Sequence, residues 1–359
     1  SAKGTTLGGD DGIAVAMALA ILDDTSLSHP AIEAIFTVDE ETGMYGAEGL
    51  DVSVLKGRRM LNMDSEDEGV FTVSCAGGAR ADCCLPIRRQ QFGAPVQEIA
   101  VTGLVGGHSG AEIDKGRANS SMLLGRVLCA LEQKTPLRVI SVSGGLKDNA
   151  IPTASVALVA ADAGAVQAVC AEMDAAFKKE YRVNDPAITV SARPAESSLL
   201  PMDEASSRSA VCLLACLPNG IQAMSADMPG LVQTSLNLGI LTTGDDAVHA
   251  SFSVRSSVAT QKQMLIDRLR CLTESLGGSV STHGEYPGWE FMPQSPLRDL
   301  MVQVFTDQYG YAPKVEAIHA GLECGLFSAK LPGLDCVSFG PDLKERSEEH
   351  TSELQSQQP

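Results

Sequence analysis

Apolar residues recur at helical and strand-like intervals along the first part of the chain. Residues 12–22 keep an apolar face at helical spacing behind Asp10, a suitable N-cap, and therefore predict a helix. Three strand-like apolar runs follow at residues 31–38, 58–63 and 70–74. Short strands that alternate with helices are typical of an α/β fold, so we expect a mainly parallel sheet in this region.

The pattern changes after Cys75, where longer strand-like runs are interleaved with amphipathic helical segments. This mixture predicts an α+β domain. Its predicted strands lie at residues 96–103, 137–142, 155–161, 187–193, 233–241 and 247–255, and its predicted helices lie at residues 119–132, 165–179, 205–216 and 262–276.

The first pattern returns after a Tyr-Pro-Gly-Trp segment that ends at Trp289 and is interpreted as a linker. A helix is predicted at residues 296–309, and strands are predicted at residues 314–319 and 335–339. We therefore expect one domain to be inserted into another. Inserted domains of this kind commonly close over a site as lids.

The expected domain boundaries follow from these changes of pattern. The outer domain is expected at residues 1–80 and 287–343, and the inserted α+β lid domain at residues 81–286. Residues 344–359 are polar and without periodicity, and part of this segment resembles a translated sequencing adapter, so we expect a non-native tail there.

Composition narrows the class of protein. A chain of 359 residues with 44% hydrophobic content can bury the cores of two domains. Its net charge of -18 opposes a phosphate backbone, so we expect no nucleic-acid partner. No run is apolar enough to span a bilayer and no export signal opens the chain, which favours a soluble cytoplasmic protein. The ten cysteines lack zinc-ribbon spacing and are expected to be buried thiols in a reducing compartment.

Four carboxylates stand where predicted strands and turns meet. Glu40 and Glu41 follow the apolar run at residues 31–38, and Asp10 and Asp64 occupy comparable turns. The carboxyl ends of strands in an α/β sheet open onto the binding crevice, so these side chains are expected to converge. Considered alone, Asp10 is better interpreted as a helix cap, and the adjacent pair Glu40 and Glu41 is better interpreted as part of a solvated turn.

Together, these carboxylates suit a hydrolase with two metal ions. Such an enzyme needs a bridging carboxylate, further ligands on each ion, and a separate base for the bridging water. One of two adjacent glutamates can be neutralised by a metal while the other stays outside the coordination shell. We therefore expect Glu40 to be the base and Glu41 a ligand.

Several motifs in this order resemble the M20 metallopeptidase family, and within it the aminoacyl-histidine dipeptidases. They are Leu-Gly-Gly-Asp-Asp-Gly around Asp10, Asp-Glu-Glu-Thr-Gly around Glu40, Asn-Met-Asp-Ser-Glu around Asp64, Gly-Gly-His-Ser-Gly around His108, Asn-Ala-Ile-Pro from Asn149, and His-Ala-Gly-Leu-Glu-Cys-Gly from His319. The resemblance covers nearly everything outside the tail. It implies that the outer domain, residues 1–80 and 287–343, is the catalytic domain and that residues 81–286 form a lid or dimerisation domain. It implies two divalent metal ions, with Zn2+ expected and Mn2+ or Co2+ as alternatives.

The resemblance also implies roles for single residues. Asp10 matches the bridging aspartate, while Glu41 and Asp64 match ligands of the two ions. Glu40 matches the general base.

Residues of the lid and of the last segment match substrate-contacting positions. His108 matches a lid histidine that stabilises the oxyanion, which requires a donor aimed at the developing charge. Asn149 and Arg255 match residues that hold the terminal carboxylate of the substrate, a task suited to the planar Arg fork. His319 and Glu323 are expected to contact substrate, although each could instead be a buried residue with a structural role.

The sequence departs from the family pattern at both ends. The family's His-x-Asp motif would lie upstream of Ser1, and its last metal-binding histidine would follow Pro341. On this reading the chain is truncated at both ends, and we expect weak metal binding and little or no turnover.

The expected activity is hydrolysis of Xaa-His and other unblocked dipeptides by a metal-activated water. An N-acyl amino acid deacylase, a tripeptidase, or a non-catalytic protein with a peptidase-like fold, in which the lid could form a homodimer, are the alternatives.

Overall fold

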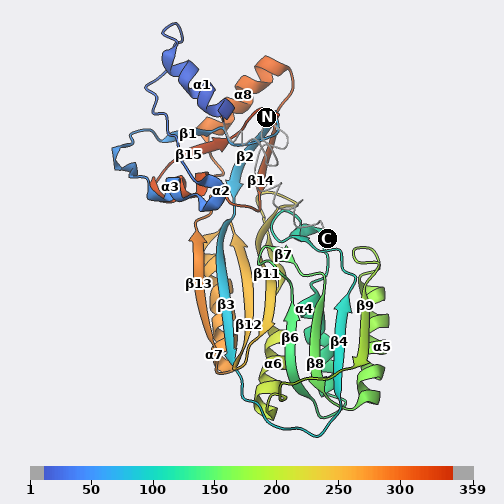
Figure 1. The fold of residues 1–359 in the computed structure, drawn as a ribbon. Coiled ribbons are helices and arrows are strands. Elements are labelled where there is room, and N and C mark those ends of the chain that lie inside the picture. Colours follow the sequence, from blue (N-terminus) through green and yellow to red (C-terminus); the bar gives the residue numbers. More distant parts are fainter. Residues whose placement is uncertain (1–11, 343–359) are drawn as a thin grey trace, which may run out of the picture. The chain divides into compact units, whose positions relative to one another are not determined.

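The computed structural model describes residues 12–342, without the side chains of residues 41 and 42, and shows two compact units (Figure 1). The first unit comprises the described parts of Ser1–Gly77, Ala226–Leu231 and Tyr286–Pro359, and the second comprises Gly78–Ser225 and Val232–Glu285. Each unit has hydrophobic clusters of its own. Each unit is therefore described by itself below.

The first unit is built around a four-stranded sheet with strand order β1-β15-β2-β14. β1 runs parallel to β15, and β14 runs parallel to β2, whereas β15 and β2 are antiparallel. Its strands are β1 (Arg59–Asn62), β2 (Val70–Cys75), β14 (Lys314–Ile318) and β15 (Asp335–Ser338). Its helices are α1 (Gly12–Asp23), α2 (Glu40–Gly43), α3 (Tyr45–Gly49), the short 3-10 helix η1 (Val52–Val54), α8 (Pro296–Tyr309) and α9 (Glu323–Lys330). The expected mainly parallel sheet is confirmed.

Helix α8 of this unit begins and ends where the sequence suggests. Ser295 caps α8 by accepting a hydrogen bond from the Arg298 N–H at 3.0 Å, and Pro296 occupies the first helical position. Gly310 ends the helix in the left-handed region, with φ at 79°. α8 packs on β15, and its Phe305 lies edge-on to Phe71 of β2 with ring centroids 5.6 Å apart.

One predicted strand is wrong. Residues 31–38 form no strand, and nearly all of their side chains are exposed. A strand requires a partner for its N–H and C=O groups, and no described strand pairs with this run. A side chain makes the local contact instead, since the Glu33 carboxylate accepts the Lys56 and Gly57 N–H groups.

Helix α1 confirms the helix predicted at residues 12–22, although its expected apolar face is not buried. None of its residues is buried, and Leu19 remains 53% exposed.

The second unit contains a nine-stranded, largely antiparallel sheet with strand order β13-β3-β12-β11-β6-β8-β4-β9, and β10 pairs with β11. A separate two-stranded ladder joins β5 to β7. The strands are β3 (Gly77–Pro86), β4 (Val96–Thr102), β5 (Gly107–His108), β6 (Arg138–Gly144), β7 (Ala150–Ile151), β8 (Ser155–Ala160), β9 (Thr189–Pro194), β10 (Gly220–Met224), β11 (Val232–Thr243), β12 (Ala247–Ser256) and β13 (Ser279–Tyr286).

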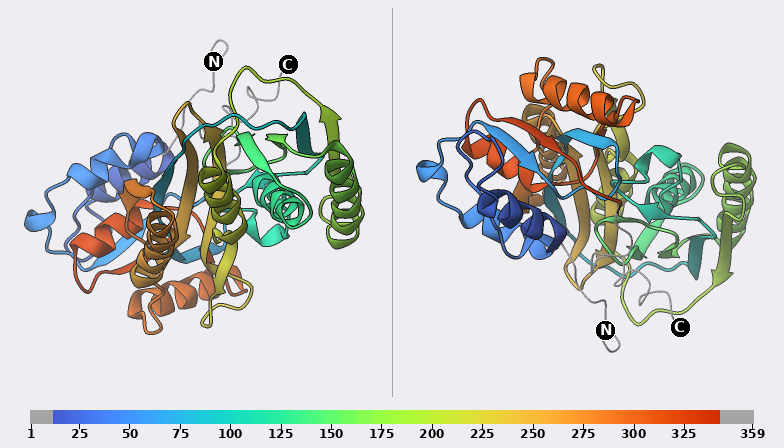
Figure 2. Two further views of the ribbon diagram at one scale, coloured as in Figure 1. Left: turned by 90° about the horizontal axis from the view of Figure 1, so that it is seen from below. Right: turned by 90° about the horizontal axis from the view of Figure 1, so that it is seen from above.

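Four long helices pack against one face of this sheet, as the two views of Figure 2 show. They are α4 (Ser120–Glu132), α5 (Ala163–Glu180), α6 (Glu204–Cys216) and α7 (Ala259–Ser275), and the short 3-10 helix η2 (Ile113–Lys115) precedes α4. Three of them start at side-chain caps that the sequence supplies, namely Asn119, Asp162 and Asp203. The predicted α+β architecture of this segment is confirmed.

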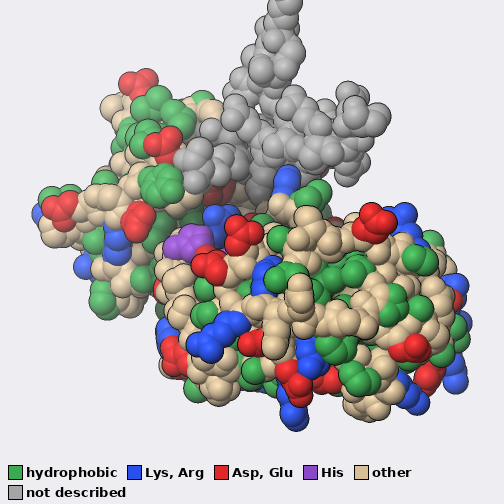
Figure 3. Space-filling model, turned by 60° about the horizontal axis from the view of Figure 1, so that its bottom comes forward, with side chains coloured by type: hydrophobic (Ala, Val, Ile, Leu, Met, Phe, Trp, Pro, Cys, Tyr) green, Lys and Arg blue, Asp and Glu red, His purple; other side chains and the backbone are tan. Residues whose placement is uncertain are grey.

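Surface and thiol expectations have mixed outcomes. Among the described residues, no helix is long and apolar enough to cross a membrane. On the face shown in Figure 3, acidic and basic side chains are intermingled. All ten cysteines are free thiols, but Cys216 and Cys271 are exposed, so the expectation that all of them are buried is wrong.

Candidate active site

Glu40, the predicted base, is the first residue of α2 and is partly exposed. The residue before it, Asp39, adopts the left-handed conformation with φ at 56°. Non-glycine residues rarely adopt this conformation, Asp less rarely than most, and such strain concentrates at functional sites. The turn into Glu40 is therefore a locally strained element. Asp10 and the side chain of Glu41 lie outside the described residues.

Asp64, the second described carboxylate of the constellation, lies in a turn directly after β1. Its N–H donates to the Asn62 side chain at 3.3 Å. The same Asn62 oxygen accepts a hydrogen bond from the Ser338 hydroxyl at 2.6 Å, and Ser338 lies 2.9 Å from the Ser65 hydroxyl. Gly340 packs so closely that a Cβ there would stand 1.7 Å from the Ser65 carbonyl oxygen. The ends of β1 and β15 thus hold the Asp64 turn.

His319 and Glu323 flank the connection between β14 and α9. His319 follows β14 directly and is 9% exposed, whereas Glu323 opens α9 and is 8% exposed. One Glu323 oxygen, Oε2, accepts a hydrogen bond from the Thr37 hydroxyl at 3.0 Å. Its other oxygen, Oε1, is buried and has no hydrogen-bond partner among the residues that the structure describes.

The environment of Glu323 changes its proton affinity. Burial raises the pKa of the Glu323 carboxyl above its usual range, and the Thr37 hydroxyl offsets part of this rise. Thr37 lies three residues before Glu40 in the sequence, so this hydrogen bond connects α9 to the strained turn. Glu323 is therefore a desolvated carboxyl, and its hydrogen-bond donor Thr37 belongs to the segment that leads into the predicted base.

Buried thiols lie under this part of the site. Burial raises the pKa of the Cys75 thiol to about 11. The pKa of the Cys324 thiol is also raised, first by burial, then by Cys336 and Cys75, and to a smaller extent by the charge of Asp64. These thiols remain protonated at neutral pH, and Asp64 is close enough to act on one of them.

The second unit carries His108 in the two-stranded ladder. His108 pairs with Ala150, and the neighbouring Ser109 N–H donates to the Asn149 carbonyl at 2.7 Å. The ladder therefore holds His108 and Asn149 together, although 41 positions separate them in the sequence.

Arg255 belongs to the same region of this unit. It lies on β12 opposite Ser235 of β11, two residues from Asn237 on the same face of that strand. The Asn237 amide donates to the Asp148 carbonyl at 3.3 Å and to the Ala150 carbonyl at 2.8 Å. Asn237 thus connects the Arg255 strand pair to the loop that carries Asn149.

The donor chemistry of the predicted ligands fits divalent metal ions. Asp10, Glu41 and Asp64 would offer carboxylate oxygens, which suit Zn2+ and Mn2+. No three His, Cys, Asp or Glu side chains of the described residues form a metal cluster. Of the three ligands, only the Asp64 side chain is described, and it lies in a well-anchored turn.

The structure also shows site residues that sequence reasoning missed. Thr37 contacts Glu323, Asn237 holds the Asn149 loop, and Glu112 and Arg117 contact the His108 loop. Only the last two carried a sequence signal, because both are charged residues within nine positions of a glycine-rich histidine loop.

Comparison with known proteins places these motifs in a family. The family described as "Peptidase family M20/M25/M40" matches residues 2–357. The cytosol non-specific dipeptidase of Escherichia coli (strain K12) is 34% identical over 347 residues, which is 95% of this chain and 72% of that protein. The crystal structure of an aminoacylhistidine dipeptidase from Vibrio alginolyticus has a TM-score of 0.91 at 35% identity and is matched over 97% of this chain and 72% of that one.

Proposed function

Because this chain belongs to the peptidase family M20/M25/M40, we propose that it is a metal-dependent dipeptidase that hydrolyses Xaa-His and other unblocked dipeptides in the cytoplasm. The observation that carries the proposal is the similarity to an aminoacylhistidine dipeptidase, with a TM-score of 0.91 across both units. A relative whose printed name is cytosol non-specific dipeptidase supports the same activity and location.

Asp10, Glu41 and Asp64 would hold two divalent metal ions, and we propose that both ions are Zn2+. When bound, such ions would lower the pKa of a water molecule to about 7 and would polarise the scissile carbonyl. The anchored Asp64 turn supports this proposal, because a ligand on a fixed turn loses little conformational entropy on binding.

The chain's own residues then divide the proton transfers and the binding. Glu40 takes a proton from the attacking water and returns it to the leaving amine. His108 donates a hydrogen bond to the carbonyl oxygen as negative charge develops there. Asn149 and Arg255 hold the terminal carboxylate of the dipeptide. The backbone contact of Asn149 with Ser109, and the hydrogen bond of Asn237 to the Ala150 carbonyl, support the placement of Asn149 and Arg255 in one region.

Glu323 is proposed to receive the free ammonium group of the substrate. A buried carboxyl oxygen without a partner costs free energy unless a donor or a cation reaches it. An α-ammonium group supplies both a positive charge and N–H donors, and Thr37 occupies the other oxygen. This contact favours unblocked dipeptides over N-acyl amino acids. His319, buried beside the same connection, is proposed as a second substrate contact.

The proposal is tested with the zinc-loaded protein and three substrates: an unblocked Xaa-His dipeptide, its N-acetyl form, and a tripeptide. We expect the dipeptide to be cleaved fastest. Glu40→Ala should lower kcat by about 10²–10⁴-fold, the usual contribution of a general base. Glu48→Ala, which changes an exposed glutamate of α3, is the matched control and should leave kcat unchanged. Preferential cleavage of the N-acetyl form or of the tripeptide would favour the alternative activities.

A further inference from the structure

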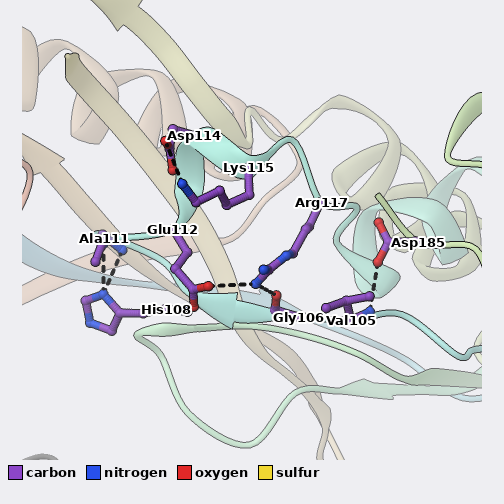
Figure 4. A network of polar contacts seen from close by, with 10 residues as sticks. Val105, Gly106, His108, Ala111, Glu112, Asp114, Lys115, Arg117 and Asp185 are labelled. Atoms are coloured by element: carbon purple, nitrogen blue, oxygen red, sulfur yellow. Dashed lines mark hydrogen bonds and ion pairs between the residues drawn. The ribbon is translucent and has the colours of Figure 1, made fainter. Parts of the chain in front are cut away.

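The His108 ring accepts hydrogen bonds at a defined nitrogen. Its Nδ1 receives the backbone N–H of Gly110 at 3.2 Å and that of Ala111 at 3.0 Å (Figure 4). A hydrogen on Nδ1 would point at these two donors, so the neutral ring carries its hydrogen on Nε2. His108 therefore presents an N–H donor on the side of the ring away from its own loop.

Two charged side chains hold the backbone on which this ring is mounted. Glu112 Oε2 accepts the His108 N–H at 2.9 Å, and its Oε1 lies 3.0 Å from Arg117 Nη1. The same Arg117 nitrogen donates to the Gly106 carbonyl at 2.5 Å. Figure 4 shows this chain of contacts running from the loop before His108 to the loop after it. The Glu112 pKa is lowered, chiefly by the His108 N–H and also by Arg117, so the carboxylate is charged at neutral pH.

The space around Gly107 is filled by the same pair. A Cβ on Gly107 would lie 2.4 Å from Arg117 Nη1 and 2.7 Å from Glu112 Oε2, and the Gly107 φ of 139° favours glycine. The charged groups therefore pack directly on the backbone next to His108. This close fit leaves little freedom for the peptide that precedes the ring.

Both ends of the loop are fixed by a buried carboxylate. Asp185, which is fully buried, accepts the Val105 N–H at 2.8 Å through Oδ1 and the Ala118 N–H at 2.7 Å through Oδ2. The loop at residues 105–118 is thereby closed at its base. Glu112 and Arg117 act within a closed loop, where a small displacement of the backbone moves the ring.

We propose that Glu112 and Arg117 are positioning residues that hold His108 with its Nε2–H presented to the substrate carbonyl oxygen. The inference rests on the proposed function, because it needs the oxyanion role of His108. A preorganised donor acts on the transition state more than on the ground state, so loss of its support lowers kcat while KM changes little.

The test uses two readouts on the zinc-loaded full chain. Histidine ring nitrogens are observed by NMR at pH 8, where His108 is assigned by its loss in His108→Asn and exposed His249 serves as internal reference. Dipeptide hydrolysis gives kcat and KM. The variants are Glu112→Ala, Glu112→Gln and Arg117→Lys, and the matched control is Glu180→Ala, which removes the exposed Arg126–Glu180 pair of the same unit.

In the wild type, His108 should show Nε2–H and a hydrogen-bonded Nδ1. In Glu112→Ala, the Nδ1 resonance should move toward that of His249, and kcat should fall about 10-fold with KM within about 2-fold. Glu112→Gln retains an acceptor for the His108 N–H and should recover part of kcat. In Arg117→Lys, the ammonium group can reach only one of the two acceptors, the Gly106 carbonyl or Glu112. Its kcat should therefore lie between those of Glu112→Ala and the wild type. Glu180→Ala should match the wild type in both readouts.

Unchanged ring resonances and an unchanged kcat in Glu112→Ala, with an active wild type, would overturn the inference alone. A fall in thermal stability that is accompanied by neither the ring signature nor the kcat effect would show a structural role only, and it would also overturn the inference. If Glu112→Ala does not fold, Glu112→Gln provides the same comparison. A wild type that cleaves no dipeptide would overturn the proposed function and the inference with it.

Discussion

At the residue scale, the buried Glu323 carboxyl is the most informative side chain of the first unit. The sequence alone predicted that Glu323 either contacts the substrate or has a structural role, and it did not distinguish the two. Within the described part of the chain, the structure adds a buried Glu323 oxygen that has no hydrogen-bond partner, and a hydrogen bond from Thr37 to the other oxygen. Both facts come from the three-dimensional packing and cannot be derived from sequence spacing. Both facts favour a site for a positively charged group.

Replacement of Glu323 should change the choice of substrate. In Glu323→Gln the negative charge is lost, so kcat/KM for an unblocked dipeptide should fall about 10–100-fold, as expected for loss of a charge-assisted hydrogen bond. The N-acetyl dipeptide has no ammonium group, and its kcat/KM should change little. Competing hydrolysis of the two substrates measures the ratio. A ratio that is the same in both proteins would remove Glu323 from the substrate site.

The same residue predicts a pH dependence of stability. The raised pKa of the Glu323 carboxyl means that the folded state holds this proton more tightly than the unfolded state. Its stabilising contribution is present below the unfolded pKa of about 4.3 and is lost as pH rises through the folded pKa. Relative to Glu323→Gln, the wild type should therefore lose free energy of unfolding between acidic and neutral pH.

Urea unfolding across that pH range gives the measurement, and Glu48→Gln at an exposed position is the control. A difference between wild type and Glu323→Gln that stays constant with pH would show that Glu323 titrates alike in both states.

At the scale of elements, amphipathic segments were predictable, whereas the first and last strands of the second unit were not. The helices α4 to α8 and most central strands appear where apolar periodicity places them. β3 and β13 were missed because their apolar signal is weak. The buried alternate positions of β3 carry mostly small side chains, Ala79, Ala81 and Cys83, and β13 has few apolar residues. The run at residues 31–38 was wrongly predicted as a strand, since periodicity cannot supply a pairing partner.

The crossing of α4 and α6 gives a prediction with a definite sign. Gly→Ala inside a helix usually stabilises it by about 1 kcal/mol, but a Cβ on Gly125 would stand 2.8 Å from the Leu214 carbonyl oxygen. Overpacking should dominate, and Gly125→Ala should destabilise the second unit by about 1–3 kcal/mol. Gly244→Ala, where the nearest atom is 3.6 Å away, should have little effect. Thermal unfolding measures both, and a stabilised Gly125→Ala would contradict the tight helix contact.

At the scale of the whole molecule, each unit has hydrophobic clusters of its own. The large cluster of the second unit contains residues from Ala81 to Leu269, whereas the main cluster of the first unit draws on Met44, Trp289 and Phe327. An inserted domain was predictable from the change of pattern after Cys75. The return of Ala226–Leu231 to the first unit was not, because a six-residue segment that contains Pro-Gly is too short to show a periodicity.

Separate cores predict two unfolding transitions in calorimetry. Gly125→Ala should move only the transition of the second unit. Gly340→Ala, whose Cβ would meet the Ser65 carbonyl, should move only that of the first unit. A single transition moved by both variants would show that the two units unfold as one. Self-association through the second unit stays a prediction from the family resemblance.

The most direct test of the central claim, metal-dependent dipeptide hydrolysis, is a zinc titration of the chelated protein. The rate of cleavage of an unblocked Xaa-His dipeptide is followed against the number of ions bound. The account predicts no cleavage by the metal-free protein and a rate that rises as two ions bind to each chain. Cleavage by the metal-free protein at the zinc-loaded rate, or a rate that does not rise as zinc binds, would contradict it.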